Sequence, residues 1–281
     1  MTATALTVAG SDPSGGAGVQ ADLKTFSALG VYGTAVLTAL TAQNTRGVTG
    51  VHAVPPAFVG EQLRTLLDDV SVHATKLGML GTAAVVREVA AVLRERPCGP
   101  VVCDPVMVAT SGDRLIDEDA VAALRTELLP LTDLITPNVP EAAALLECAP
   151  ATSADELPDQ AAALLALGPR AVLLKGGHLG GEESVDVLAT AHGVWTTSRP
   201  RIATTATHGT GCTLSSALAA LAARSGTADW PVLAEQARTY LQRALEGGAS
   251  LGIGSGPAGS GHGPVHHFAG IWPDDAVAPG G

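Results

Sequence analysis

Short apolar runs alternate with Ala- and Leu-rich segments along most of this 281-residue chain, and this alternation limits the fold more than any other feature. The apolar runs have the length of buried strands, whereas the Ala- and Leu-rich segments have the length of helices. Strands that alternate with helices in this way build a mainly parallel sheet with helices on both faces. The sequence therefore predicts an α/β fold with one central sheet.

The expected strands are Ala5–Ala9, Ala35–Ala39, Thr75–Met79, Val101–Asp104, Leu134–Thr136, Ala171–Leu174, Val185–Ala189 and Val194–Thr197. The last two flank His192-Gly193 and are expected to pair as an antiparallel hairpin. The expected helices are Val19–Leu29, Pro56–Val70, Ala83–Arg94, Asp117–Leu128, Thr213–Ala223 and Val232–Leu245. The sequence shows no internal repeat, and the Gly/Pro-rich stretch Gly247–Pro264 is interpreted as a surface tail, so one domain is expected.

Composition limits which kinds of molecule the protein is expected to bind. Hydrophobic residues make up 46% of the chain, enough for a substantial core, and aromatic residues make up 3%, so Ala, Val and Leu must do most of the packing. A formal net charge of −11 argues against a nucleic-acid surface but not against a nucleotide, whose phosphates Gly-rich amides and Mg²⁺ can hold. The first basic residue is Lys24, and no apolar run reaches the roughly 18 residues of a membrane span. A cytoplasmic protein without a membrane partner is expected.

The four cysteines do not form a metal or redox motif. They are Cys98, Cys103, Cys148 and Cys212, and no two of them stand in a C-x-x-C spacing. The first three are expected to be reduced and mostly buried thiols.

The first candidate for a functional segment is the Gly-rich turn Gly10–Gly18, which follows the first expected strand. In doubly wound sheets, ligands bind beyond the carboxyl ends of the strands, and glycines let the backbone approach a ligand closely. The spacing of these glycines matches neither a Walker loop nor G-x-G-x-x-G. A plain strand-to-helix turn remains the alternative.

The second candidate is the run from His208 to Thr213, which contains Gly209, Gly211 and Cys212 and leads into a helix. Glycines at a helix N-terminus expose successive N–H groups to an anion. Cys212 falls in the first turn, where the helix dipole is expected to lower its pKa and favour the thiolate. The alternatives are a structural turn with a buried Cys and a Cys/His hydrolase that uses His208, although adjacency in sequence is weak support for such a pair.

Three more charged residues follow expected strands. Asp104 and Glu141 could hold Mg²⁺ directly or through its waters, but each could also be a helix cap or a surface charge. Lys175 could meet a phosphate as a point charge, or it could be a solvated loop residue. Together these segments supply what phosphoryl transfer requires: positioning, a metal ion, charge stabilisation and a base near the acceptor hydroxyl.

At these residues the sequence resembles the hydroxymethylpyrimidine/phosphomethylpyrimidine kinase family of the ribokinase-like superfamily, from Ala5 to about Phe268. The order of the shared segments is specific, whereas any one of them alone is not. The segments are Ala9–Gly18, Gln20–Thr25, Ala42–Thr45, Lys76–Leu80, Asp104–Met107, Thr136–Asn138, Lys175–His178, His208–Thr213 and Gly263–Phe268.

The resemblance implies a ribokinase-like three-layer α/β/α sandwich with little or no separate lid. It implies one kinase domain over residues 1–270, with a disordered tail at 271–281. The implied activity is ATP-dependent phosphorylation of 4-amino-5-hydroxymethyl-2-methylpyrimidine and then of its monophosphate, giving the pyrophosphate for thiamin biosynthesis. The implied cofactors are ATP as phosphoryl donor and Mg²⁺, and members of this family are often homodimers.

The resemblance also implies roles for individual residues. Cys212 stands where related sugar kinases carry an Asp base, and the backbone at Gly209 and Gly211 forms an anion hole. Asp22 and Gln43 hydrogen-bond the aminopyrimidine. The residues expected around the ring are Gly10, Ala17, Met79 and Val106; those expected near the nucleotide are Asn138, Lys175 and Thr210; and those expected to organise Mg²⁺ are Asp104 and Glu141.

One departure and two rivals remain open. Thr110 stands where members of the family often have Lys, which puts in doubt a contact from that Lys to phosphate. Pyridoxal kinase has the same fold and reaction with a different hydroxymethyl heteroaromatic. A non-catalytic pyrimidine-binding protein would be expected to lose Cys212, the Gly-Thr-Gly turn or the acidic pair, all of which are present.

Overall fold

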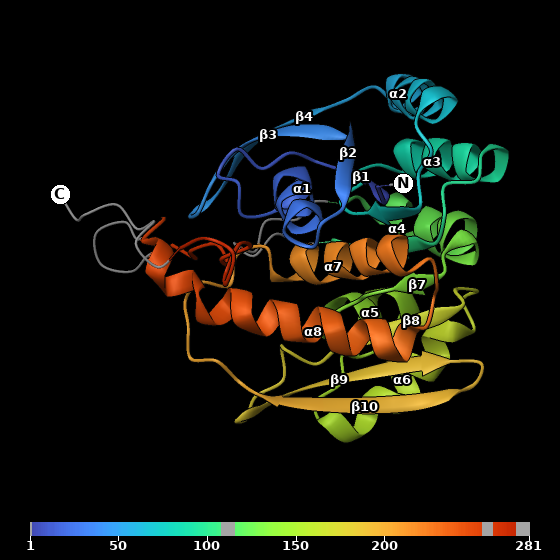
Figure 1. Ribbon diagram of the computed structural model, residues 1–281. Helices are drawn as coiled ribbons and strands as arrows, with labels where there is room; N and C mark the ends of the chain where they lie inside the picture. Colours follow the sequence, from blue (N-terminus) through green and yellow to red (C-terminus); the bar gives the residue numbers. More distant parts are fainter. Residues whose placement is uncertain (1, 108–115, 255–260, 274–281) are drawn as a thin grey trace.

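A mainly parallel sheet forms the middle of the molecule, as the alternating sequence predicts. The computed structural model describes residues 2–107, 116–254 and 261–273. Within this part, eight strands pair in the order β10-β9-β8-β7-β6-β5-β1-β2, parallel from β2 to β8 and antiparallel at β9 and β10 (Figure 1). The strands are β1 (Thr4–Ala9), β2 (Tyr32–Leu37), β5 (Ala74–Leu77), β6 (Val101–Cys103), β7 (Leu134–Ile135), β8 (Ala171–Lys175), β9 (Glu183–Thr190) and β10 (Gly193–Pro200).

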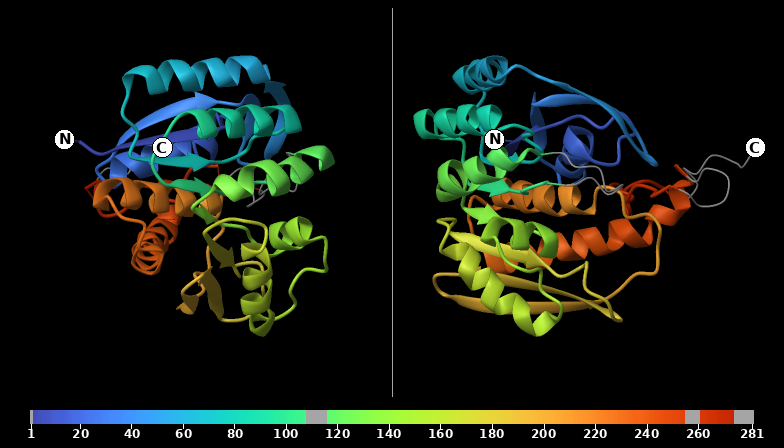
Figure 2. Two further views of the ribbon diagram at one scale, coloured as in Figure 1. Left: turned by 90° about the vertical axis from the view of Figure 1, so that its right-hand side faces the viewer. Right: turned by 180° about the vertical axis from the view of Figure 1, so that it is seen from behind.

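Helices cover both faces of the sheet and bury two separate apolar layers against it (Figure 2). One face carries α1 (Gly18–Ala28), α7 (Thr210–Ser225) and α8 (Trp230–Glu246). The other face carries α2 (Pro56–Asp69), α3 (Ala83–Glu95), α4 (Glu118–Ala123), α5 (Val139–Leu146) and α6 (Leu157–Leu165), and α4 continues through a π-helical turn. These layers confirm the predicted three-layer α/β fold class.

Small side chains allow α7 to lie directly on the sheet. Every residue of this helix from Thr213 to Ala223 is buried, and most of them are Ala, Leu or Ser. α7 contacts β1, β5 and β6 on one side and α1 and α8 on the others. The N-terminus of α7 is thereby fixed at the carboxyl ends of the central strands.

A small hairpin was not expected from the sequence. Strands β3 (Ala39–Asn44) and β4 (Gly47–Ala53) form a separate antiparallel pair beside β2, and the expected strand Ala35–Ala39 covers the end of β2 and the start of β3. The chain turns between these strands at Thr38, whose hydroxyl donates to the carbonyl of Met79 at 2.6 Å. The expectation of little or no separate lid stays a prediction.

Two helices, α5 and α6, are also absent from the expected set. Each carries a proline in its first turn, at Pro140 and Pro158, where the missing N–H costs nothing. Because proline usually indicates the end of a helix, the sequence did not indicate where these two helices begin.

The interpretation of Gly247–Pro264 as a surface tail is wrong for its described part. Gly248 packs against Ala206, and the N–H of His208 donates to the carbonyl of Gly263 at 3.0 Å. The next residue after this stretch, Val265, is fully buried. The segment therefore returns to the site and supports it.

Several expectations lie at the edge of the description. Thr110 and residues 274–281 fall outside the described residues, so the role of Thr110 and the tail at 271–281 stay predictions. Trp272, inside the expected tail, stacks on Phe268 with ring centroids 5.1 Å apart. Within the described residues, no helix has the length and apolar character needed to cross a membrane.

Candidate active site

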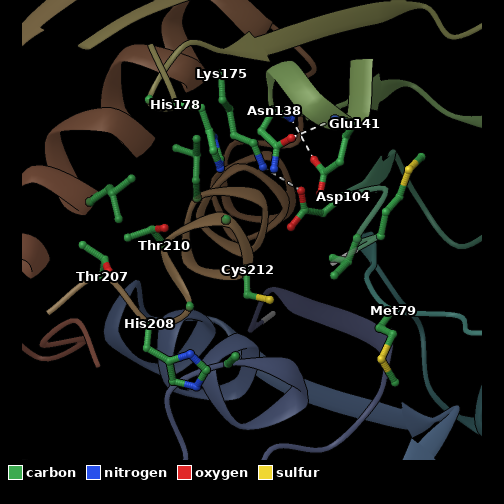
Figure 3. Close-up of a pocket in the computed structure, with 18 of the residues that line it drawn as sticks. Met79, Asp104, Asn138, Glu141, Lys175, His178, Thr207, His208, Thr210 and Cys212 are labelled. Atoms are coloured by element: carbon green, nitrogen blue, oxygen red, sulfur yellow. Dashed lines mark hydrogen bonds and ion pairs between the residues drawn. The ribbon is translucent and has the colours of Figure 1, made fainter. Parts of the chain in front are cut away.

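A cavity of about 930 Å³ opens where the central parallel strands end (Figure 3). Its wall comes from the Gly-rich turn after β1, from β3, from the N-termini of α5 and α7, and from the β9–β10 hairpin and α8. All the predicted site residues except Asp22 line it. They are Gly10, Ala17, Gln43, Met79, Asp104, Val106, Asn138, Glu141, Lys175, Gly209, Thr210, Gly211 and Cys212.

The prediction that Asp22 hydrogen-bonds the ring is not supported by its position. Asp22 is fully buried behind the cavity wall and forms an ion pair with Lys76, with Nζ 2.9 Å from each carboxylate oxygen. Hydroxyls of Thr7 and Ser216 also donate to it at 2.5 Å each. With its oxygens engaged in this way, Asp22 is a structural neighbour of the site and not a ligand of the ring.

The two Gly-rich turns touch each other. Gly209 has a φ of +80°, and a Cβ at this position would lie 1.7 Å from the carbonyl oxygen of Gly16, so only glycine fits. Asp12 and His208 join the same turns through a 2.7 Å contact between Oδ2 and Nε2. Asp12 also accepts from the backbone N–H of Ala17 at 2.8 Å. These contacts hold the Gly-rich turn after β1 against the turn that leads into α7.

Asp12 was not singled out from the sequence, and His208 was considered only as a partner of Cys212. The ring nitrogen of His208 contacts Asp12 and lies 3.5 Å from the hydroxyl of Ser14. The side chain is thus committed to the Gly-rich turn. This arrangement removes the support for the Cys/His hydrolase interpretation.

The N-terminus of α7 presents free donors to the cavity. Among the described residues, the N–H groups of Gly211 and Cys212 have no protein acceptor. A Cβ on Gly211 would lie 3.2 Å from Nζ of Lys175 and 3.3 Å from Oδ2 of Asp104, so the glycine keeps these groups close to the helix end. A helix N-terminus with unpaired amides is a binding place for a phosphate.

Asp104 and Lys175 form a buried ion pair at the carboxyl ends of β6 and β8. Lys175 Nζ lies 2.9 Å from Oδ1 of Asp104, which also accepts from the hydroxyl of Thr136 at 3.0 Å. The nearby Asp104 and Glu141 outweigh burial and hold the pKa of Lys175 above its ordinary value. Lys175 therefore carries a positive charge at the cavity wall, and the solvated-loop alternative is wrong.

Asn138 and Glu141 close a capping box at the start of α5. The backbone N–H of Asn138 donates to Oε2 of Glu141 at 2.8 Å, and the N–H of Glu141 donates to Oδ1 of Asn138 at 2.9 Å. Glu141 is thus a helix cap that also lines the cavity. Burial, aided by the charge of Asp104, raises the pKa of Glu141 to about 7.

The two carboxylates fit one partly hydrated divalent cation. In the described residues, no three His, Cys, Asp or Glu side chains gather into a cage for a metal. Mg²⁺ in phosphoryl-transfer sites is commonly held by one or two carboxylates together with waters and substrate phosphates. Asp104 and Glu141 supply that number, and the charge of Lys175, whose Nζ lies 2.9 Å from Asp104, acts against the effect of burial on the pKa of Glu141.

The expected thiolate at Cys212 is corrected by its surroundings. Burial raises the pKa of this thiol to about 11, although Lys76 and the N–H of Gly18 act in the lowering direction. The helix dipole was the only influence visible in the sequence, and desolvation outweighs it. Figure 3 shows Cys212 between His208, Met79 and the Asp104–Lys175 pair, at the centre of the cavity.

One part of the cavity wall was missed altogether. It comes from the β9–β10 hairpin and α8, where Arg238 forms a 2.9 Å ion pair with the buried Asp186. The N–H of Gly176 donates to the same carboxylate at 3.1 Å. Neither Arg238 nor Asp186 directly follows a parallel strand. The rule that ligands bind beyond the carboxyl ends of such strands therefore could not predict them.

Comparison with known proteins settles the family. Residues 12–266 match the sequence profile described as phosphomethylpyrimidine kinase. The chain belongs to the phosphomethylpyrimidine kinase family. A hydroxymethylpyrimidine/phosphomethylpyrimidine kinase of Escherichia coli is 52% identical over 268 residues, which cover 95% of this chain and 98% of that protein. The family, the enzyme class and the fold predicted from the sequence are confirmed.

Solved structures of this family and of a neighbouring one share the fold. A pyridoxal kinase of Bacillus subtilis in complex with ADP is 34% identical, with a TM-score of 0.84 over 96% of this chain and 98% of that one. A phosphomethylpyrimidine kinase of Clostridium difficile is 37% identical, with a TM-score of 0.76 over 86% of this chain and 99% of that one.

Proposed function

We propose that this chain transfers the γ-phosphoryl group of ATP to 4-amino-5-hydroxymethyl-2-methylpyrimidine and then to its monophosphate, in thiamin biosynthesis. The observation that carries the proposal is one cavity in which the predicted ring contacts and the predicted phosphate contacts meet at Cys212. A coupled assay of ADP release with a panel of alcohols tests it. Release of ADP with the hydroxymethylpyrimidine supports the proposal, and release with none of the alcohols contradicts it.

The acceptor side of the cavity suits a flat heteroaromatic ring. Gly10 lies close to Met79, since a Cβ there would be 2.4 Å from Cε of Met79, and Ala17 and Val106 add small apolar walls. Gln43 projects from β3 next to a bulge, a feature that re-aims a side chain. Its Oε1 lies 3.1 Å from the hydroxyl of Thr41, which also contacts the carbonyl oxygen of Ser11 at 2.8 Å, and an amide can both donate to and accept from an aminopyrimidine edge.

The phosphate side suits the donor nucleotide. Lys175, Asn138 and Thr210 line the cavity next to the free amides of α7, and the pyridoxal kinase of Bacillus subtilis, solved with ADP, has the same fold. We place the γ-phosphate at the α7 N-terminus and the rest of the nucleotide toward α8. ATP is the proposed donor.

The chemical step is an in-line displacement at the γ-phosphorus. The hydroxymethyl oxygen forms the new P–O bond, the bond between the γ-phosphorus and the bridging oxygen breaks, and ADP leaves with that electron pair. The thiolate form of Cys212 accepts the hydroxyl proton, and the amides of Gly209 and Gly211 and the charge of Lys175 stabilise the transferring group. When bound at Asp104 and Glu141, Mg²⁺ would neutralise phosphate charge.

Gln43→Ala is expected to weaken binding of the pyrimidine. The loss of a partner for a ring polar group costs about 1–3 kcal/mol, which corresponds to a roughly 5- to 150-fold rise in KM with little change in kcat. Steady-state kinetics of the hydroxymethylpyrimidine measure it. Gln236→Ala, the same substitution at an exposed position of α8, is the control. An unchanged KM in the Gln43 variant would refute this assignment of the pocket.

Pyridoxal kinase activity is the second candidate, because a pyridoxal kinase shares the fold at a TM-score of 0.84. The relative at 52% identity is a pyrimidine kinase, which favours the first candidate. Measuring kcat/KM for both alcohols under the same conditions decides between them. A larger value for pyridoxal would make the pyrimidine the secondary substrate.

A homodimer is the proposed assembly. Exposed apolar side chains come from the neighbouring elements β2, β3, β4 and α2, and they are Tyr32, Leu40, Val51 and Phe58. Leu40 and Val51 point to opposite faces of the β3–β4 hairpin, so a second copy would remove part of this set from water. Light scattering of the purified protein gives the mass. A monomer at micromolar concentration would contradict the proposal.

A further inference from the structure

Two helix N-termini converge on Cys212. The residue lies in the first turn of α7 and lines the same cavity as Gly18, the first residue of α1, whose backbone N–H acts to lower the pKa of the thiol. The two helices pack against each other on the same face of the sheet. Each N-terminus carries a partial positive charge, so both favour a negative charge on this sulfur.

A buried charge pair lies one helical turn behind this point. Asp22 follows Gly18 by four residues in α1, and Ser216 follows Cys212 by four residues in α7. Residues four apart share a helix face, one turn or about 5.4 Å along the axis. The hydroxyl of Ser216 donates to Oδ1 of Asp22 at 2.5 Å, so the two second turns meet at this carboxylate.

Lys76 completes the pair from the sheet. It is the register partner of Thr7 across β1 and β5, and both side chains reach Asp22. The side chains of Lys76 and Asp22 are 0% exposed. Burial opposes the charge on Lys76, but Asp22 outweighs it and holds the pKa of the ammonium above its ordinary value. An apolar pair of similar volume would usually be at least as stable, so stability is a poor reason for placing charges here.

We propose that Lys76 is a positioning residue whose buried ammonium, held in place by Asp22, stabilises the thiolate form of Cys212 that is needed to accept the proton of the acceptor hydroxyl. This inference rests on the proposed function, because it gives Cys212 the role of base. The other charged groups that act on Cys212 are Asp104 and Lys175, which are paired with each other at 2.9 Å. Lys76 is therefore the cation that neither substrate nor water can screen.

The rate of alkylation of Cys212 by iodoacetamide tests the inference without any turnover. We choose a Cys148→Ser background, because Cys148 is exposed whereas Cys98 and Cys103 are buried. Lys76→Met removes the positive charge and is expected to slow alkylation at pH 8 about tenfold, since one nearby charge shifts a pKa by about one unit or more. Asp22→Asn leaves the ammonium without its counter-charge and is expected to speed alkylation by a similar factor. Peptide mass mapping measures both rates.

Opposite changes in the two variants separate a charge effect from loss of structure. Both variants are expected to lower Tm, because each leaves one buried charge unpaired. A purely structural role would move alkylation in the same direction in both variants, or not at all, and either result overturns the inference. If a single variant does not fold, the double variant Asp22→Asn/Lys76→Met removes both charges. Slower alkylation of the double variant supports the inference, and an unchanged or faster rate overturns it.

The base assignment can fail separately. Cys212→Ser with near-full kcat would remove the proton-accepting role and leave the charge coupling measured by alkylation intact. Unchanged alkylation rates in Lys76→Met and Asp22→Asn, together with a large loss of kcat in Cys212→Ser, would overturn the charge coupling and leave the role of Cys212 as base intact. Ser216→Ala removes only a hydrogen bond to Asp22 and is the matched control, with an expected change in alkylation of less than about threefold.

Discussion

Replacing Cys212 by Ser is expected to lower kcat by about 10²- to 10⁴-fold while the KM for ATP changes little, because general-base catalysis contributes a factor of this size. The sulfur lies at the centre of the cavity, beside the amides of Gly211 and its own residue. Single-turnover and steady-state kinetics measure the loss. Cys148→Ser, the same substitution at an exposed cysteine, is the control variant.

The pH dependence of kcat gives a sharper form of the same prediction. The thiolate accepts the proton, and burial raises the pKa of Cys212 to about 11, so the fraction of active thiolate grows as the pH rises toward that value. We therefore expect kcat to increase from neutral to alkaline pH. In Cys212→Asp the base is a carboxylate with a much lower pKa, so any remaining activity is expected to lose this rise. A flat profile in the unmodified enzyme, or near-full kcat in Cys212→Ser, would leave Cys212 a packing residue.

Asp104→Asn is expected to lower activity by at least about tenfold at limiting Mg²⁺, since it removes a charge from the proposed metal site and keeps the shape of the side chain. The amide still has an oxygen that can accept from Thr136 and Lys175. Excess Mg²⁺ is expected to restore part of the activity by mass action, provided that the defect lies in metal affinity. Titration of the initial rate with Mg²⁺ measures it.

The control for this variant is Asp159→Asn, the same change at an exposed position of α6. Glu141→Gln is expected to behave as Asp104→Asn does, because it too retains the oxygen needed for the capping box. Equal losses at every Mg²⁺ concentration would instead assign these carboxylates to holding Lys175 and α5 in place.

The sequence was most informative where a ligand-facing residue directly follows a parallel strand or precedes a helix. Gly10, Asp104 and Lys175 were found in this way, because strand ends meet at one edge of a parallel sheet. The roles proposed for these three residues are predictions that the variants above test.

The sequence was least informative where a role depends on a partner distant along the chain. The sequence around Asp22 would be the same whether its side chain faced the ligand or Lys76. Only the fold shows that it forms an ion pair with Lys76. The dipole at Cys212 was visible, but the burial that outweighs it was not. Arg238 comes from the covering helix α8 and follows no strand, so no local pattern marks it.

The position of α7 has a consequence for how the enzyme is made. The helix lies against β1, β5 and β6, which leave the ribosome long before it does. Until residues 210–225 have been synthesised, α1 covers β1 but the same apolar face of β5 and β6 lacks the helix that packs on it, and the amides that would bind phosphate do not exist. Contacts this far apart in sequence slow folding and leave partly made chains prone to aggregate. We therefore expect chains stopped before residue 210 to depend on chaperones and to bind neither substrate.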